Sequence, residues 1–223
     1  MRRLEPDYDS DPGRWRSMDR RWLLVGDVHE VVAERIARRR LGSVLDIGCG
    51  QGRLRDVLPA PVRWAGVDQS STQLRSCPHR PVVRADAGRL PFADEAFGTV
   101  AALWMLYHLD RPEDAIREAR RVLRPGGVFF TCTSARTNDP ELCDGYPATT
   151  FDAEEAPEIV ADAFGTCALA VDRWDAPLVR LPDRDAVEAY ARSHHLPAHT
   201  ADRVSAPITL TKRGVLVSAT VLR

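Results

Sequence analysis

Short apolar runs alternate with amphipathic segments between residues 43 and 132. Nearly continuous hydrophobic character is typical of strands that are buried on both faces of a parallel sheet. The expected strands are 43–47, 62–68, 81–86, 99–106 and 127–132. Strands that alternate with helices predict an α/β protein with a doubly wound, mostly parallel sheet.

Two segments in the first half of the chain have the apolar spacing of amphipathic helices. The first begins at Trp22 and is closed by Gly42, after cations that suit a helix C-terminus. The second is RPEDAIREARRVLRPGG, in which Pro112 fits the first turn. Its apolar stripe consists of Ala115, Ile116, Ala119, Val122 and Leu123.

The pattern loosens after Cys132. It predicts a long loop at 134–150, a helix at 152–164, a strand at 167–174 and a helix at 183–195. The C-terminal segment ITLTKRGVLVSATVL predicts two strands joined by a turn at 212–214. We expect 134–150 and 182–207 to form a small cap that shapes a substrate pocket.

The 223 residues carry a formal net charge of −1, which disfavours nucleic acid as a partner because chains that bind it usually have a basic excess. The length fits a single domain.

No run approaches the roughly 20 apolar residues of a membrane span, and the charged N-terminus lacks the apolar core of a signal peptide. The five cysteines include no CxxC pair, which favours reduced thiols and no metal site. We expect a cytoplasmic protein without a membrane partner, either a monomer or a homodimer.

Three glycines alternate in VLDIGCGQG, directly after the first expected strand. Glycine is favoured where a Cβ would not fit, and such a turn at the carboxyl edge of a parallel sheet is a common ligand site. A tight turn without a ligand is the alternative. The spacing matches neither the NAD fingerprint G-x-G-x-x-G nor the phosphate loop G-x-x-x-x-G-K-[ST]. Asp46 would repel a pyrophosphate and suits a ligand with a cationic amino group instead.

The segment DIGCGQG resembles motif I of the class I S-adenosylmethionine (SAM)-dependent methyltransferases, D/E-x-G-x-G-x-G. The resemblance covers residues 40–134, where WAGVDQS and RADAGRLPF end two further strands on acids. The segment ALWMLYHLDRPEDAIREARRVLRPGG looks like the branch typified by ubiquinone and menaquinone C-methyltransferases. The resemblance implies a Rossmann-like seven-stranded sheet with an antiparallel C-terminal strand. It also implies SAM as cofactor and S-adenosylhomocysteine (SAH) as product.

In that family the methionine part of SAM lies at the glycine loop, one strand-end acid bridges the ribose hydroxyls, and another reads the adenine edge. The resemblance assigns these roles to residues 46–52, Asp68 and Asp86. Each acid also has a structural alternative: Asp46 could cap the turn, Asp68 the next helix, and Asp86 its own loop. The expected cofactor-binding residues are Asp46, Gly48, Cys49, Gly50, Asp68, Gln69, Asp86, Ala87 and Leu103.

Methyl transfer from a sulfonium is an in-line displacement for which a general base is optional. Tyr107 and His108 close the fourth expected strand, so His108 is the first candidate base, with a structural role as the alternative. His194 and His195 lie in the expected cap and are reserve candidates, although histidine pairs in loops are more often solvated. We expect transfer by proximity alone.

The expected acceptor-binding residues are Tyr8, Trp15, Tyr107 and Tyr146. The first two belong to an expected N-terminal lid, residues 1–22, and simple packing of these aromatics is the alternative. The fourth expected strand is not followed by the [DNS]-P-P-[YFW] motif of nucleobase amino-methyltransferases, which favours a small-molecule acceptor.

The sequence therefore predicts a SAM-dependent methyltransferase that acts on an O, N or C atom of a small metabolite. The alternative is a SAM- or SAH-binding protein of the same fold with a structural role or a different reaction.

Overall fold

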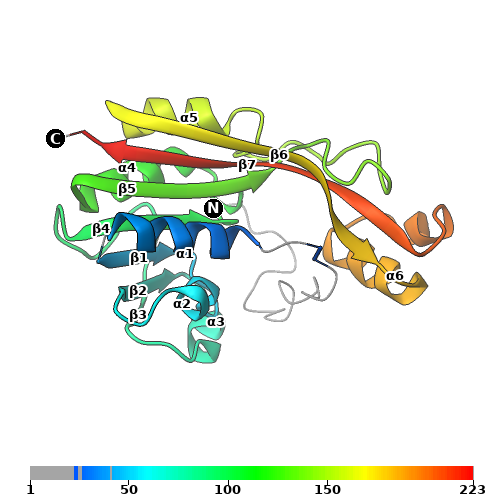
Figure 1. Cartoon of the computed structure of the whole chain (residues 1–223), viewed down its shortest axis with the longest axis horizontal. Helices are drawn as coiled ribbons and strands as arrows, with labels where there is room; N and C mark the ends of the chain where they lie inside the picture. The colour runs from blue at the N-terminus through cyan, green and yellow to red at the C-terminus, as the bar shows by residue number, and fades with distance from the viewer. Residues whose placement is uncertain (1–22, 25–26, 41, 223) are drawn as a thin grey trace.

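The computed structural model describes residues 23–24, 27–40 and 42–222. Within these residues, seven strands form one sheet in the order β3-β2-β1-β4-β5-β7-β6 (Figure 1). The strands are β1 (Ser43–Ile47), β2 (Arg63–Asp68), β3 (Val82–Arg84), β4 (Phe97–Leu103), β5 (Leu123–Ser134), β6 (Cys167–Leu181) and β7 (Ile208–Val221). Neighbours from β3 to β5 are parallel, and β7 is antiparallel to both β5 and β6. The predicted fold class is confirmed.

Helices cover both faces of the sheet and also lie beyond one edge. The α-helices are α1 (Val28–Arg39), α2 (Arg53–Val57), α3 (Ser71–Ser76), α4 (Pro112–Val122), α5 (Ala156–Phe164) and α6 (Arg184–Ser193). Two 3₁₀ helices are η3 (Leu106–His108) and η4 (Ala198–Asp202). No helix among the described residues is long and apolar enough to cross a membrane.

Each face of the sheet has its own hydrophobic core. Ile116 of α4 packs with Phe129 and Val217 on one face, and Ile36 of α1 packs with Phe130 on the other. Adjacent residues of a strand point to opposite faces, so Phe129 and Phe130 of β5 serve different cores. Burial of both faces explains why the parallel strands read as continuous apolar runs.

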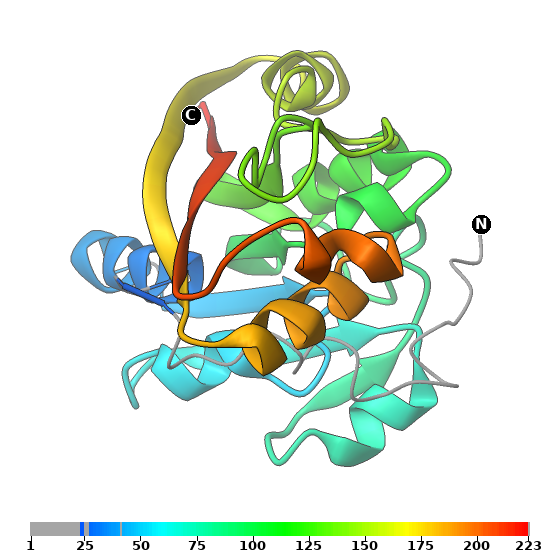
Figure 2. The same cartoon turned by 90° about the vertical axis from the view of Figure 1, so that its right-hand side faces the viewer.

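Strands β6 and β7 extend past the carboxyl edge, the edge at which the parallel strands end (Figure 1). The pairing runs from Cys167 opposite Val221 to Leu181 opposite Ile208. Figure 2 shows α6 and η4 in front of this edge. A third core cluster lies here and contains Leu142, Val179, Leu181, Ala186, Val187, Tyr190, Ala201 and Leu210. We refer to residues 134–150 and 182–207 as the cap.

Helix α4 differs little from prediction, but the predicted start of the first helix is wrong, because Leu23 pairs with Val179 and the N–H of Leu24 donates to the carbonyl of Leu178 at 2.9 Å. Pro112 occupies the first turn of α4 as expected. Helix α1, as described, begins at Val28, because the carboxylate of Asp27 caps it by accepting the backbone N–H of His29 at 2.8 Å. Trp22 itself lies outside the described residues.

Several strand boundaries were predicted wrongly. Strand β5 begins at Leu123 rather than at 127, and β6 runs to Leu181 rather than to 174. The fourth strand ends at Leu103 rather than at residue 106, because Trp104 adopts a left-handed φ of 57°. The predicted turn at 212–214 does not form. Strand β7 continues through Gly214, which pairs with Ser134 on one side and Trp174 on the other. Pairing with β5 and β6 holds this segment extended despite its glycine.

Candidate active site

The glycine loop connects β1 to α2 at the carboxyl edge. Gly48, Gly50 and Gly52 have φ values of 69°, 52° and 85°, in the left-handed region that disfavours other residues. A Cβ on Gly48 would also lie 2.8 Å from the Cβ of Met105. The glycines therefore serve both the turn and a close approach to the residues that follow β4.

Asp68, at the end of β2, joins the glycine loop to α3. One carboxylate oxygen accepts the backbone N–H of Gly50 at 2.8 Å, and the other accepts that of Ser70 at 2.8 Å. The N-cap of α3 is Ser70, whose hydroxyl accepts the N–H of Gln73. The alternative that Asp68 itself caps this helix is therefore wrong. Its carboxylate lies against the middle glycine of the loop.

Asp46 lies inside β1 and is only 4% exposed. The indole of Trp64 donates to its carboxylate at 3.3 Å. Burial raises the pKa of Asp46 to about 7, with His29 of α1 opposing the shift. Its role in binding a cationic ligand stays a prediction. The raised pKa means that the carboxyl group gains or loses its charge near neutral pH.

The other predicted cofactor residues lie at the same edge, with different exposure. Asp86 is exposed after β3 and accepts the N–H of Gly88 at 2.9 Å, so it does support its own loop. Cys49, Ala87 and Leu103 are buried, and Gln69 is exposed. Burial raises the pKa of Cys49 above its usual range, so its thiol is neutral and suits packing rather than nucleophilic chemistry.

These residues fit SAM. The glycine loop leaves open space at Gly50, where an added Cβ would meet no protein atom closer than Gln73 Oε1 at 3.9 Å. A carboxylate that accepts up to about four hydrogen bonds stands beside this space at Asp68 and suits a vicinal diol. Residues 46–52, Asp68 and Asp86 would hold the cofactor.

Tyr107 and His108 lie in η3 rather than at the end of a strand. Both are half-buried, and their rings are 4.4 Å apart between centroids. The backbone N–H of His108 donates to Met105 at 3.0 Å, which closes the turn. They were predicted to close the fourth strand, but that strand ends at Leu103 and both residues lie in the separate 3₁₀ turn that follows it.

The two cap histidines are unlike each other. The ring of His194, at the end of α6, stacks on Tyr190 with centroids 3.9 Å apart. Burial lowers the pKa of His194 to about 4, so it is neutral at pH 7. His195 is exposed, with a left-handed φ of 53°. The other predicted acceptor residues, Tyr8 and Trp15, lie outside the described residues.

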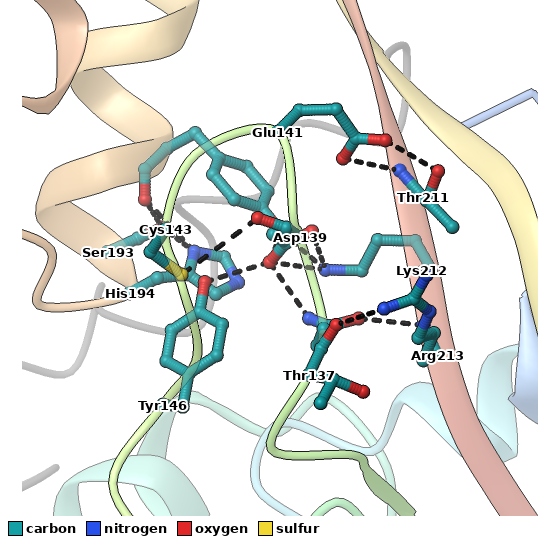
Figure 3. Close-up of polar contacts among 12 residues, drawn as sticks. Thr137, Asp139, Glu141, Cys143, Tyr146, Ser193, His194, Thr211, Lys212 and Arg213 are labelled. Atoms are coloured by element: carbon teal, nitrogen blue, oxygen red, sulfur yellow. Dashed lines mark hydrogen bonds and ion pairs between the residues drawn. The ribbon is translucent and has the colours of Figure 1, made fainter. Parts of the chain in front are cut away.

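Sequence reasoning missed a polar network in the cap, centred on Asp139 (Figure 3). Asp139 is fully buried and has a left-handed φ of 53°. Its carboxylate accepts hydrogen bonds from Lys212 at 2.7 Å, Tyr146 at 2.8 Å and Tyr190 at 2.9 Å. Of these residues only Tyr146 was singled out from the sequence. The signal was weak, because NDP at 138–140 indicates a turn but does not reveal partners far along the chain.

The Asp139 network connects the loop 134–150, α6 and β7. Burial lowers the pKa of Lys212, an effect that Asp139 opposes. The pKa values of Tyr146 and Tyr190 are raised by burial and by Asp139, so both phenols stay protonated and donate. The network therefore fixes the cap to the sheet.

Residues 45–131 match the family model described as a methyltransferase domain. The demethylmenaquinone methyltransferase of Desulfitobacterium hafniense is 30% identical over 118 residues, which are 47% of this chain and 47% of that protein. The 27-O-demethylrifamycin SV methyltransferase of Amycolatopsis mediterranei is 36% identical over 96 residues, 38% of this chain and 35% of that protein. The chain spans half or less of the length of the curated relatives it matches.

Solved structures extend the likeness in fold to most of the chain. The YcgJ protein from Bacillus subtilis has a TM-score of 0.63 and 16% identity, and covers 87% of this chain and 98% of its own. The [4+2]-cyclase SpnF has a TM-score of 0.58 and 21% identity, and covers 87% and 82%.

Residues 45–131, which contain the glycine loop and the strand-end acids, match a methyltransferase domain, and the fold is Rossmann-like; together they support a class I SAM-dependent methyltransferase. The family predicted from the sequence is confirmed.

Proposed function

We propose that the protein transfers a methyl group from SAM to an O, N or C atom of a small molecule. The observation that carries the proposal is the carboxylate of Asp68, held at 2.8 Å from the backbone N–H of Gly50 in a loop of left-handed glycines. In this arrangement the Asp68 carboxylate can accept hydrogen bonds from the two ribose hydroxyls of SAM, beside an open stretch of backbone at Gly50. Two similar proteins, the demethylmenaquinone methyltransferase and the 27-O-demethylrifamycin SV methyltransferase, are named for small-molecule acceptors, which supports a small acceptor here.

When bound, SAM supplies a methyl group that is already activated by its sulfonium. The chain must therefore orient the acceptor and exclude water, and a base is needed only if the acceptor must lose a proton. In this proposal, Tyr107 and the cap residues orient the acceptor. The cap and the N-terminal lid remain part of this proposal.

Proximity is our preferred mode of transfer. His108 lies in a closed 3₁₀ turn with its ring against Tyr107, which suits packing. The Nδ1 of His194 lies 2.9 Å from the carbonyl oxygen of Tyr190, so this ring is held by its own helix. His108→Ala should lower the rate less than about a hundredfold, at the low end of the range for general catalysis. A larger loss with SAM affinity intact would identify His108 as the base.

The alternative is a protein that binds SAM or SAH without methyl transfer. Fold does not separate the two, because the [4+2]-cyclase SpnF shares it. The test is turnover of methyl-labelled SAM against a panel of phenols, amines and carbon acids, with SAM affinity measured by calorimetry. Tight SAM binding without label transfer to any acceptor would favour the alternative.

The same calorimetry tests the site. Asp68→Ala removes hydrogen bonds to a charged group, which contribute roughly 1.5–3 kcal/mol, so SAM affinity should fall at least tenfold. Asp162→Ala, at an exposed position on α5, is the matched control and should bind SAM normally. Unchanged affinity in Asp68→Ala would contradict the assignment.

A further inference from the structure

Two tryptophans meet at the carboxyl edge although their strands are not neighbours. Trp104 directly follows β4 and Trp174 lies in β6, with β5 and β7 between those strands. Their rings are 6.0 Å apart between centroids at an interplanar angle of 68°, an edge-to-face contact. We call these two residues the tryptophan pair.

Gly214 of β7 makes this contact possible. It lies directly opposite Trp174 in the sheet. A Cβ on Gly214 would stand 2.3 Å from Cζ2 of Trp174, far closer than real atoms approach. The indole of Trp174 therefore lies over a position without a side chain and reaches across β7. Any other residue at 214 would displace it.

The tryptophan pair packs against the same core cluster as Cys49 of the glycine loop. Met105, which follows Trp104, packs against the other core instead, with its Cβ 2.8 Å from the place of a Cβ on Gly48. Trp104 itself holds a left-handed φ of 57°, which is strained for a bulky residue. Such strain clusters at ligand sites, where the surrounding structure imposes it.

The pair is only partly covered by protein. Both tryptophans are half-buried and pack against the core under α1, which includes Val28. Lys212 lies two residues before Gly214 and so belongs to the same face of β7. Its ammonium is paired with Asp139 at 2.7 Å. The surface next to the glycine loop is therefore aromatic, and its nearby cation is already compensated.

We infer that the tryptophan pair is the surface on which the methyl acceptor stacks, and that the acceptor is an uncharged, planar ring compound. The inference rests on the proposed function, because it places the acceptor beside the cofactor loop. Flat aromatic side chains favour flat ligands through face and edge contacts that a puckered ring cannot make. Trp104 and Trp174 are thus specificity-determining residues.

The test uses two probes with the same carbon skeleton and one hydroxyl, planar 2-naphthol and puckered decahydro-2-naphthol. Their binding to the SAH-saturated protein is measured by calorimetry. We expect 2-naphthol to bind at least about fivefold more tightly than the saturated alcohol. Equal binding of the two probes, or no binding of 2-naphthol up to its solubility limit, would overturn the inference.

Variants locate the surface. Trp174→Ala should weaken 2-naphthol binding about tenfold and remove the preference over the saturated alcohol, whereas Trp174→Phe should retain part of it. Gly214→Ala should act in the same direction by displacing Trp174. Phe92→Ala is the matched control, because Phe92 is a half-buried aromatic that makes a similar edge-to-face pair with Phe97 elsewhere.

SAH affinity separates the possible failures. If the unaltered protein does not bind SAH, the proposed function fails. If it binds SAH and Trp174→Ala retains both SAH affinity and full 2-naphthol affinity, the inference about the tryptophan pair fails while the proposed function stands. Loss of 2-naphthol binding in Phe92→Ala as well would also contradict a local role for the pair.

Discussion

At the scale of single residues, the structure separates two costs of replacing a glycine. Gly50 and Gly42 both have left-handed φ values, 52° and 68°, and both have open space where a Cβ would stand. Alanine at either position costs a similar backbone strain, about 1–2 kcal/mol. Only Gly50 lies in the glycine loop beside Asp68. The two positions therefore form a matched pair for testing the cofactor site.

We expect Gly50→Ala to lose most SAM affinity and Gly42→Ala to keep it, at similar stability. A Cβ on Gly50 would occupy the space in which we place the cofactor, whereas Gly42 lies at the opposite edge of β1. Calorimetric titration of SAM and urea unfolding of both variants provide the measurements. Equal SAM affinities would show that the open space at Gly50 is not used.

Asp46 makes a separate prediction about pH. Burial raises its pKa to about 7 in the folded protein, against about 3.9 in an unfolded chain. The folded protein thus retains a proton that the unfolded chain has released, and stability falls as pH rises from about 4 to 7. Asn cannot titrate, so Asp46→Asn should lack this component.

Urea unfolding at pH 5, 6, 7 and 8 measures the effect. The unfolding free energy of the unaltered protein, relative to that of Asp46→Asn, should decrease by about 1.4 kcal/mol per pH unit below pH 7 and level off above it. Comparison with the variant cancels the other titrating groups. A difference that does not change with pH would mean that Asp46 titrates normally.

At the scale of elements, the Asp139 network joins the long loop to α6 and β7 (Figure 3). Asp139 is fully buried and the Lys212 side chain is 14% exposed. Asp139→Asn leaves a buried ammonium without its carboxylate, and breaking such a pair costs about 3–5 kcal/mol. Combining it with Lys212→Met should restore part of the loss.

A double-mutant cycle in urea measures this coupling. We expect a coupling energy above about 1 kcal/mol for Asp139 and Lys212. The exposed pair Arg184 and Glu188, with side chains 62% and 38% exposed, is the control and should couple by less than about 0.5 kcal/mol. Similar values for the two pairs would show that the Asp139 network does not anchor the cap.

Elements also show what could be predicted from sequence. Local signals located the glycine loop, the strand-end acids and α4, because each depends on residues close together in the chain. The continuous course of β7 through Gly214 depends on pairing with β5 and β6, which local propensity does not contain. Asp139 was missed for the same reason, since its partners Tyr190 and Lys212 are 51 and 73 residues away.

At the scale of the whole molecule, the proposed cofactor site is built from the carboxyl ends of β1, β2 and β4. Asp46 is in register with Gly66 of β2 and Ala101 of β4, so these strands end together beside the glycine loop. A ligand here contacts the centre of the sheet, on which both main cores depend. Binding should therefore stabilise the fold as a unit rather than one loop.

Thermal unfolding tests this directly with SAH and NAD as competing ligands. A ligand at a hundred times its Kd stabilises the folded state by about 2.7 kcal/mol. For a chain of this size, each kcal/mol raises Tm by about 2–4 °C. SAH should thus raise Tm by roughly 5–11 °C. NAD should leave it unchanged, because the glycine spacing and Asp46 disfavour a pyrophosphate. A shift with NAD that equals or exceeds the shift with SAH would contradict the cofactor assignment, and Gly50→Ala should abolish the SAH shift while Gly42→Ala retains it.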